Sequence, residues 1–341
     1  MICFAVEATL ISTWLSIFSN RRGSTAEHLE SVAALMKITI GSRGSPLALW
    51  QANWVKDRLE AAGHELRIKI IKTSGDKLQN AALVASGTKG LFIKEIEEAL
   101  LVGEIDLAVH SMKDLPTELP EGLGVAAVPE REDPHDVLVS SGCLGLRELP
   151  PGARIGSSSL RRQSQLLALR PDLKMVAMRG NVDTRLRKLD RGDCDALVLA
   201  GAGLKRLGFA PRIASWFRED EVCPAVGQGA LSIEVSLENA NVLQAIAPLD
   251  HPPTHQSVRA ERAMLRALGG GCQLPIAAYA KYDSGVLHLT GVVASPDGTR
   301  VLRTKASGKA EYAEDLGKRA AAALIEQGAH ELLGQAESRA G

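Results

Sequence analysis

The sequence predicts an α/β protein, with two α/β domains of similar plan and a small C-terminal α+β domain. Strand-like and helix-like segments alternate from residue 37 onward, which is typical of a mostly parallel sheet covered by helices. The alternation restarts after Pro134, which indicates a second domain. After Pro252 the pattern changes to a helix, three strands and a last helix. A chain of 341 residues, 45% of them hydrophobic, is long enough for two or three domains.

The first helix has clear boundary signals. Residues 37–40 alternate as a strand and lead into a short loop. Ser45 suits the N-cap, and Pro46 suits the first position, of a helix over residues 47–62. Gly63 is expected to end that helix.

The other elements of the two α/β domains follow in order. In the first domain we expect a strand over 66–70, a mobile loop over 76–90, a helix over 91–101 and strands over 106–109 and 230–235. In the second we expect strands over 153–156, 174–178 and 195–200 and helices over 160–169 and 181–189. The chain is expected to cross between the domains at residues 130–134 and 224–229, so that the strand over 230–235 returns to the first sheet.

The C-terminal domain is expected to hold a helix over 257–268, three strands with a turn at 296–298, and a helix over 310–327. The resulting domain boundaries are 36–129 with 230–248, then 134–224, then 252–341. Residues 1–35 form an extension from which we expect no chemistry. We interpret it as a start codon assigned too early, with a transit segment or an extra helix as the alternatives.

The charge of the chain is balanced overall but not locally. Lys plus Arg and Asp plus Glu number 40 each, which gives no global argument for nucleic acid or a membrane. Only 4% of residues are aromatic and no nucleic-acid recognition motif is present. Residues 154–206, however, hold 12 basic and 5 acidic residues, a local charge of 12 − 5 = +7. This excess predicts a locally bound anionic ligand.

Five scattered cysteines, without CxxC or HxxH spacing, argue against a zinc site or a disulfide framework, so we expect no metal. That usage fits a reducing cytoplasm. No apolar run reaches the length of a membrane span.

Several arginines lie where a parallel α/β sheet binds ligands, beyond the carboxyl ends of strands. Ser159 precedes a helix whose first turn holds Arg161 and Arg162, against the usual preference for acids there. A helix N-terminus with two arginines can hold a carboxylate, although a solvated helix face with salt bridges is the alternative. Arg179 and Arg185 can face the same cleft, with surface ion pairing as their alternative.

Asp114 follows another strand end, directly after Lys113. A carboxylate in a basic cleft can stabilise a developing cation or transfer a proton. The alternative is a turn aspartate without chemistry.

Cys272 follows the glycine run 269–271. A bare backbone would give a bulky group access to the thiol. The alternative is a buried structural cysteine beside a helix end.

These segments together resemble the porphobilinogen deaminase family (hydroxymethylbilane synthases). The matching motifs lie in order between Met36 and Leu333, and they are RGSPLA at 43–48, KGLF at 89–92, HSMKDLP at 110–116, GSSSLRRQ at 156–163, RGNV at 179–182, PAVGQG at 224–229 and GGCQ at 270–273. Several long motifs in one order are far more specific than a single short one.

The resemblance implies that the first two domains are arranged like type II periplasmic binding proteins. It implies a dipyrromethane cofactor, joined by a thioether to Cys272. It further implies a monomeric transferase of tetrapyrrole (heme and porphyrin) biosynthesis. That enzyme adds four porphobilinogen molecules head to tail, releases ammonia each time, and frees linear hydroxymethylbilane by hydrolysis.

The resemblance also implies roles for individual residues. Asp114 matches the catalytic carboxylate. The positions expected to bind the cofactor are Cys272, Lys113, Ser159, Arg161, Arg162 and Asp76. The positions expected to bind substrate are Arg43, Ser45, Lys89, Arg179 and Arg185. Each pyrrole carries an acetate and a propionate, so such a set of cations suits a growing polyanion.

A non-catalytic protein that binds an anionic solute is the rival hypothesis. It would share the two α/β domains and the arginines. It would need export, for which the sequence has no convincing signal, and it would need neither the third domain nor Cys272.

Overall fold

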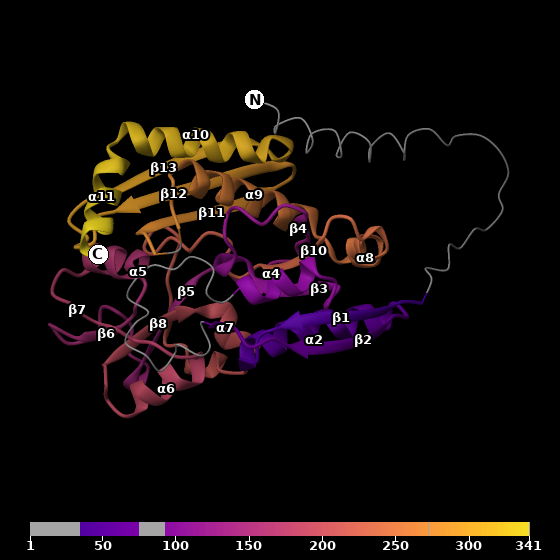
Figure 1. Cartoon of the computed structure of the whole chain (residues 1–341). Helices are drawn as coiled ribbons and strands as arrows, with labels where there is room; N and C mark the ends of the chain where they lie inside the picture. Colours follow the sequence, from indigo (N-terminus) through magenta and orange to yellow (C-terminus); the bar gives the residue numbers. More distant parts are fainter. Residues whose placement is uncertain (1–34, 75–92, 272, 341) are drawn as a thin grey trace. The chain divides into compact units, whose positions relative to one another are not determined.

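The structure, a computed structural model, describes residues 35–74, 93–271 and 273–340 (Figure 1). The predicted extension over 1–35, apart from Leu35, and the predicted loop over 76–90 fall outside these ranges. So do the first two residues of the helix predicted over 91–101.

The first sheet is mixed, and its described strands lie in the order β2, β1, β3, β10, β4. Their bounds are β1 Lys37–Ser42, β2 Glu65–Ile70, β3 Leu107–Ser111, β4 Leu123–Ala127 and β10 Leu231–Ser236. The first three strands are parallel, whereas β10 runs antiparallel to both β3 and β4. The expectation that the strand after residue 229 returns to the first sheet is therefore confirmed.

The second sheet repeats this plan, in the order β7, β6, β8, β5, β9. Its strands are β5 Asp136–Ser140, β6 Arg154–Gly156, β7 Lys174–Val176, β8 Ala196–Ala200 and β9 Ser215–Trp216. Again three parallel strands are followed by an antiparallel one, β5. Since β5 and β10 each follow a crossing segment, each sheet receives its fourth strand directly after the chain changes domain. The two α/β domains thus share one plan, as predicted from the sequence.

Helices follow most of the parallel strands, and several of the sequence motifs lie where a helix begins after a strand ends. They are α2 Pro46–Ala61, α4 Lys94–Leu101, α5 Leu160–Leu169, α6 Val182–Asp190, α7 Gly201–Arg206 and α8 Ala240–Ile246. Ser45 caps α2 as predicted, because its hydroxyl accepts a hydrogen bond from the amide of Ala48 at 3.3 Å. Ser159 and Asn181 occupy N-cap positions, but their side chains make no capping bond within the described residues.

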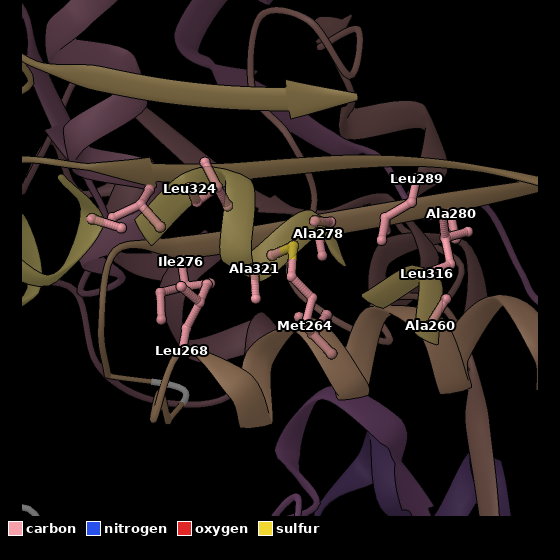
Figure 2. Close-up of a cluster of buried hydrophobic side chains, with 14 of the residues drawn as sticks. Ala260, Met264, Leu268, Ile276, Ala278, Ala280, Leu289, Leu316, Ala321 and Leu324 are labelled. Carbon is pink, nitrogen blue, oxygen red and sulfur yellow. The ribbon is translucent and has the colours of Figure 1, made fainter. Parts of the chain in front are cut away.

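The C-terminal domain is an antiparallel sheet covered by helices. It comprises α9 Pro252–Ala267, β11 Ile276–Asp283, β12 Val286–Ala294, β13 Val301–Lys309, α10 Ala313–Glu326 and α11 Ala329–Ala340. Helix α9 contacts β11 and α10 contacts both β12 and β13. Their shared core, which includes Met264, Ala278 and Leu324, is drawn in Figure 2.

The structure differs from the sequence expectations at several elements. Helix α9 begins at Pro252 rather than Ser257, because two prolines are tolerated in a first turn whose amides have no helical partner. The last helix predicted, over 310–327, is present as α10 but begins three residues later, at Ala313. The expectations did not include α11, which follows Gly328, whose φ is +99°. The expectations did not include β5, whose five residues are all buried and therefore show no alternation.

Gly317 of α10 allows the close approach of α9, and replacing it with alanine tests that contact. A Cβ there would lie 2.3 Å from the carbonyl oxygen of Ala260 and 2.8 Å from the amide nitrogen of Met264. Backbone atoms cannot rotate away, so we expect Gly317→Ala to destabilise the protein by about 1–3 kcal/mol. Thermal unfolding measures it.

The control is Gly334→Ala in α11, where a Cβ would meet nothing within 4 Å. Alanine there should be neutral or stabilising, by up to about 1 kcal/mol, because it favours the helix. A melting temperature that rises in both variants would show that the two helices do not depend on this contact.

Candidate active site

A cleft of about 250 Å³ gathers residues from the strand ends of both α/β domains. Six residues predicted from the sequence line it, namely Arg43, Ser45, Lys113, Asp114, Arg162 and Arg185. Two chain segments of the first domain supply four of them. Arg43 and Ser45 lie between β1 and α2, and Lys113 and Asp114 lie in a 3-10 turn directly after β3. The carboxyl ends of adjacent parallel strands thus form one wall, as expected of an open α/β sheet.

Lys113 is the cation nearest in sequence to the predicted catalytic carboxylate. Burial is the main reason that the pKa of its ammonium is lowered to about 8; the charge of Asp114 opposes this shift and that of Arg162 adds to it. Its Nζ lies 3.5 Å from the amide oxygen of Gln228. Asp114 itself is exposed to the cleft.

Arg161 and Arg162 are buried, with exposed fractions of 5% and 6%, so the solvated helix face considered from the sequence is wrong. Both donate to the carboxylate of Asp136, Arg161 at 2.6 Å and Arg162 at 3.0 and 2.8 Å. Burial alone would raise the pKa of Asp136, but the two guanidinium groups outweigh it and hold that pKa well below its usual range. Arg162 lines the cleft, whereas Arg161 does not.

Two further arginines line the cleft from the second domain. Nε of Arg185 donates to the carbonyl of Gly180 at 2.7 Å, and Nη2 of Arg206 donates to the carbonyl of Gly229 at 2.7 Å. Burial is the main reason that the pKa of each guanidinium is lowered to about 10. A poorly solvated cation gains more from a carboxylate than a hydrated one does.

Arg206 was missed from the sequence. It is the last residue of α7, a helix that begins directly after the parallel strand β8. The signal that could have identified it is the local excess of positive charge over residues 154–206, to which Arg206 belongs. Asp183 of α6 and Ser111 of β3 are further polar residues of the cleft that the sequence did not indicate.

The remaining predicted site residues are not brought to this cleft by the described structure. Ser159, Arg161 and Arg179 do not line it, and Arg179 is exposed. Asp76, Lys89 and Cys272 lie outside the described residues. Roles for these six residues stay predictions.

The glycine run before Cys272 has more than one function. A Cβ at Gly270 would collide with Ile276 at 2.3 Å, so that glycine serves packing. At Gly271, none of the described residues outside its chain neighbours lies within 4 Å of the Cβ position.

The described residues also bear on two other classes of site. Across residues 35–74, 93–271 and 273–340, no group of three or more His, Cys, Asp or Glu could hold a metal ion. Within the same ranges, every helix is too short or too polar to span a membrane.

Comparison with known proteins places these residues in a family context. Residues 38–244 match the family model for the porphobilinogen deaminase dipyrromethane cofactor binding domain, and residues 255–326 match that for the porphobilinogen deaminase C-terminal domain. A porphobilinogen deaminase of Geotalea uraniireducens is 52% identical over 308 residues, which cover 90% of this chain and 96% of that protein. One of Desulforudis audaxviator is 53% identical over 307 residues, covering 89% and 99%.

A solved structure, lipoprotein Tp32 of Treponema pallidum, has a TM-score of 0.40 at 16% identity over 62% of this chain and 89% of that one. This likeness is too loose to carry an argument about function.

Proposed function

Because this chain belongs to the porphobilinogen deaminase family, we propose that it joins four porphobilinogen molecules head to tail into linear hydroxymethylbilane, with release of ammonia at each addition. The matched domain is the one that binds the dipyrromethane cofactor. We propose that this cofactor is attached through a thioether to Cys272. We also propose that the chain acts as a monomeric transferase in the cytoplasm.

The cleft suits a ligand that carries many carboxylates. Four cations line it together, and each is at least half-buried: Lys113, Arg162, Arg185 and Arg206. Acetate and propionate groups on successive pyrroles would satisfy these cations by charge-assisted hydrogen bonds. When bound, the dipyrromethane group supplies the terminal pyrrole carbon to which the first substrate is joined.

The observation that carries the proposal is the position of Asp114. Its carboxylate is exposed in a cleft otherwise rich in cations. Loss of the amine from porphobilinogen leaves an electron-deficient, azafulvene-like cation, which a nearby carboxylate stabilises. The same carboxylate can hold the proton that the leaving amine requires. A protein that only binds an anionic solute has no use for a negative charge there.

We divide the other residues between the cofactor and the substrate. Lys113 and Arg162 lie beside each other and are proposed to hold the cofactor with Ser159, Arg161 and Asp76. Arg43, Ser45, Lys89, Arg179 and Arg185 are proposed to hold the incoming substrate. Arg206 is added to this substrate set because it lines the same cleft.

The three predicted domains divide this work. Residues 36–129 with 230–248 supply Asp114 and one wall, and residues 134–224 supply the arginines of the other. Residues 252–341 carry the cofactor cysteine.

The proposed function is tested by mixing the purified chain with porphobilinogen. Ammonia release should match porphobilinogen consumption one to one, and a linear tetrapyrrole mass should appear in solution. Binding of porphobilinogen without release of ammonia would favour the solute-binding hypothesis instead.

The lowered pKa of Lys113 predicts a pH dependence. The ammonium is charged below about pH 8 and becomes neutral above it. If it holds a carboxylate, kcat/KM should fall above that pH, by up to about tenfold per pH unit. The free energy of unfolding should change in the opposite direction. Below about pH 8 the folded protein buries a charged ammonium, which costs free energy. This cost disappears as the pH rises from about 8 toward 10.5, the pKa of Lys113 in the unfolded chain.

Steady-state rates from pH 7 to 10 check this expectation. Lys113→Arg is the matched control, because a guanidinium stays charged over this pH range and kcat/KM should not fall in the same way. Titration of the substrate itself affects both enzymes equally. An identical decline in both would mean that Lys113 does not hold a carboxylate.

A further inference from the structure

A buried carboxylate that the proposed chemistry does not use lies behind the cleft. Asp136, the first residue of β5, is fully buried. Its Oδ2 accepts from Arg161, and its Oδ1 accepts from Nε and Nη2 of Arg162. Oδ1 also accepts from the side-chain amide of Gln228 at 2.9 Å. Both oxygens of Asp136 are therefore engaged within the protein.

Gln228 extends this network to the first domain. Besides Asp136, its Nε2 donates to the carbonyl of Pro134 at 2.7 Å, which joins the two crossing segments. Its Oε1 lies 3.5 Å from Nζ of Lys113 and 3.4 Å from Nη2 of Arg162. The two cations that line the cleft from opposite domains thus share one amide oxygen.

The charges of this network require an internal anion. Lys113, Arg161 and Arg162 bring three positive charges together, and Asp136 contributes one negative charge, which leaves 3 − 1 = +2. Like charges at close range in a poorly hydrated interior repel strongly. Asp114 opposes this repulsion from the cleft side, but Asp136 is the carboxylate that bonds both Arg161 and Arg162 directly.

The geometry of Arg162 shows what Asp136 holds in place. Nε and Nη2 are both committed to the carboxylate, which fixes the plane of the guanidinium. Among the described residues none bonds Nη1, so this donor is left for a ligand. Arg161, by contrast, donates from one nitrogen to both Asp136 and the carbonyl of Cys223 at 2.7 Å, and lies away from the cleft.

We propose that Asp136 is a positioning residue that acts through Arg162 and Lys113 and preassembles the site for the cofactor carboxylates. Asp136 itself touches no ligand. This inference rests on the proposed function, because it assigns the ligand of Arg162 to the cofactor. Its specific consequence is that removal of the charge weakens cofactor capture.

The test is Asp136→Asn, which keeps the shape and removes the charge. Cofactor-free chain is titrated with porphobilinogen, and the gain of pyrrole mass is followed by intact-mass spectrometry. We expect the concentration for half-maximal gain to rise about tenfold or more, as for loss of a positioned charge contact.

A second readout separates positioning from general destabilisation. The charge of Asp136 raises the pKa of Lys113. Asp136→Asn should therefore lower that pKa below about 8, whereas local unfolding would move it toward 10.5. Nuclear magnetic resonance of dimethylated Lys113 measures the direction.

Two further variants serve as controls. Asp195→Asn is the same substitution in the same domain, and its partner Arg154 does not line the cleft. Measured at the same interval below its melting temperature, Asp195→Asn should capture cofactor like the wild type. If Asp136 acts through Arg162, its loss should add little once Arg162 is gone. The porphobilinogen concentration for half-maximal gain should therefore be at most about twofold higher in Arg162→Gln with Asp136→Asn than in Arg162→Gln alone.

If Asp136→Asn does not fold, Asp136→Glu keeps the charge but displaces the carboxylate from Arg162, and its half-maximal gain of pyrrole mass should likewise require more porphobilinogen. Normal half-saturation, or a Lys113 pKa that rises, would overturn the positioning role. A wild-type chain that gains no pyrrole mass and releases no ammonia would instead defeat the proposed function itself.

Discussion

Replacing Asp114 with asparagine is expected to lower kcat for porphobilinogen by about 10²–10⁴-fold, the range for loss of a group that transfers protons or stabilises charge. The amide keeps the shape of the side chain but neither the negative charge nor the basicity. Because Asp114 is exposed, the stability of the variant should stay within about 0.5 kcal/mol of the wild type. Asp114→Ala should be at least as slow.

Rates with saturating porphobilinogen, on protein of verified cofactor content, measure this effect. Glu118→Gln removes an exposed carboxylate four residues further along the same loop and outside the cleft, so it should turn over normally. Full turnover by Asp114→Ala would show that the role assigned to Asp114 is wrong.

Replacing Cys272 with alanine should abolish both cofactor attachment and turnover. The thioether requires the sulfur, and without a covalent primer the growing chain has no anchor. The wild-type mass should exceed the sequence mass by one dipyrromethane, and the variant should match its sequence mass. Porphobilinogen should be added if the wild type is purified without cofactor.

Cys143→Ala is the matched control, because Cys143 is an exposed free thiol. It should keep the mass increment and the turnover. A mass increment that persists in Cys272→Ala but disappears in Cys143→Ala would show that the cofactor is attached to Cys143 instead.

The sequence allowed the strand ends to be located, and with them Arg43, Lys113 and Asp114, because the carboxyl ends of parallel strands meet by topology alone. Arg206 was missed because a basic residue at the end of a helix is already explained by the helix dipole.

Asp136 could not be recognised for a different reason. Its partners Arg161 and Arg162 are 25 and 26 residues away, and only the packing of α5 against the second sheet makes them neighbours. The sequence therefore predicted that Arg161 and Arg162 bind an anion, but it did not show that the carboxylate of Asp136 already does so within the protein.

The exchange of β5 and β10 between the lobes has a consequence for synthesis on the ribosome. All described strands of the second sheet lie between Asp136 and Trp216, so they emerge together. Strand β10 emerges later, and its Ser232 reaches back to His110 across 122 residues. Until then β4 has no partner among the described strands, because β10 lies between it and β3. The lobe made first is thus completed last, with an open sheet edge exposed to chaperones and to aggregation in the interval.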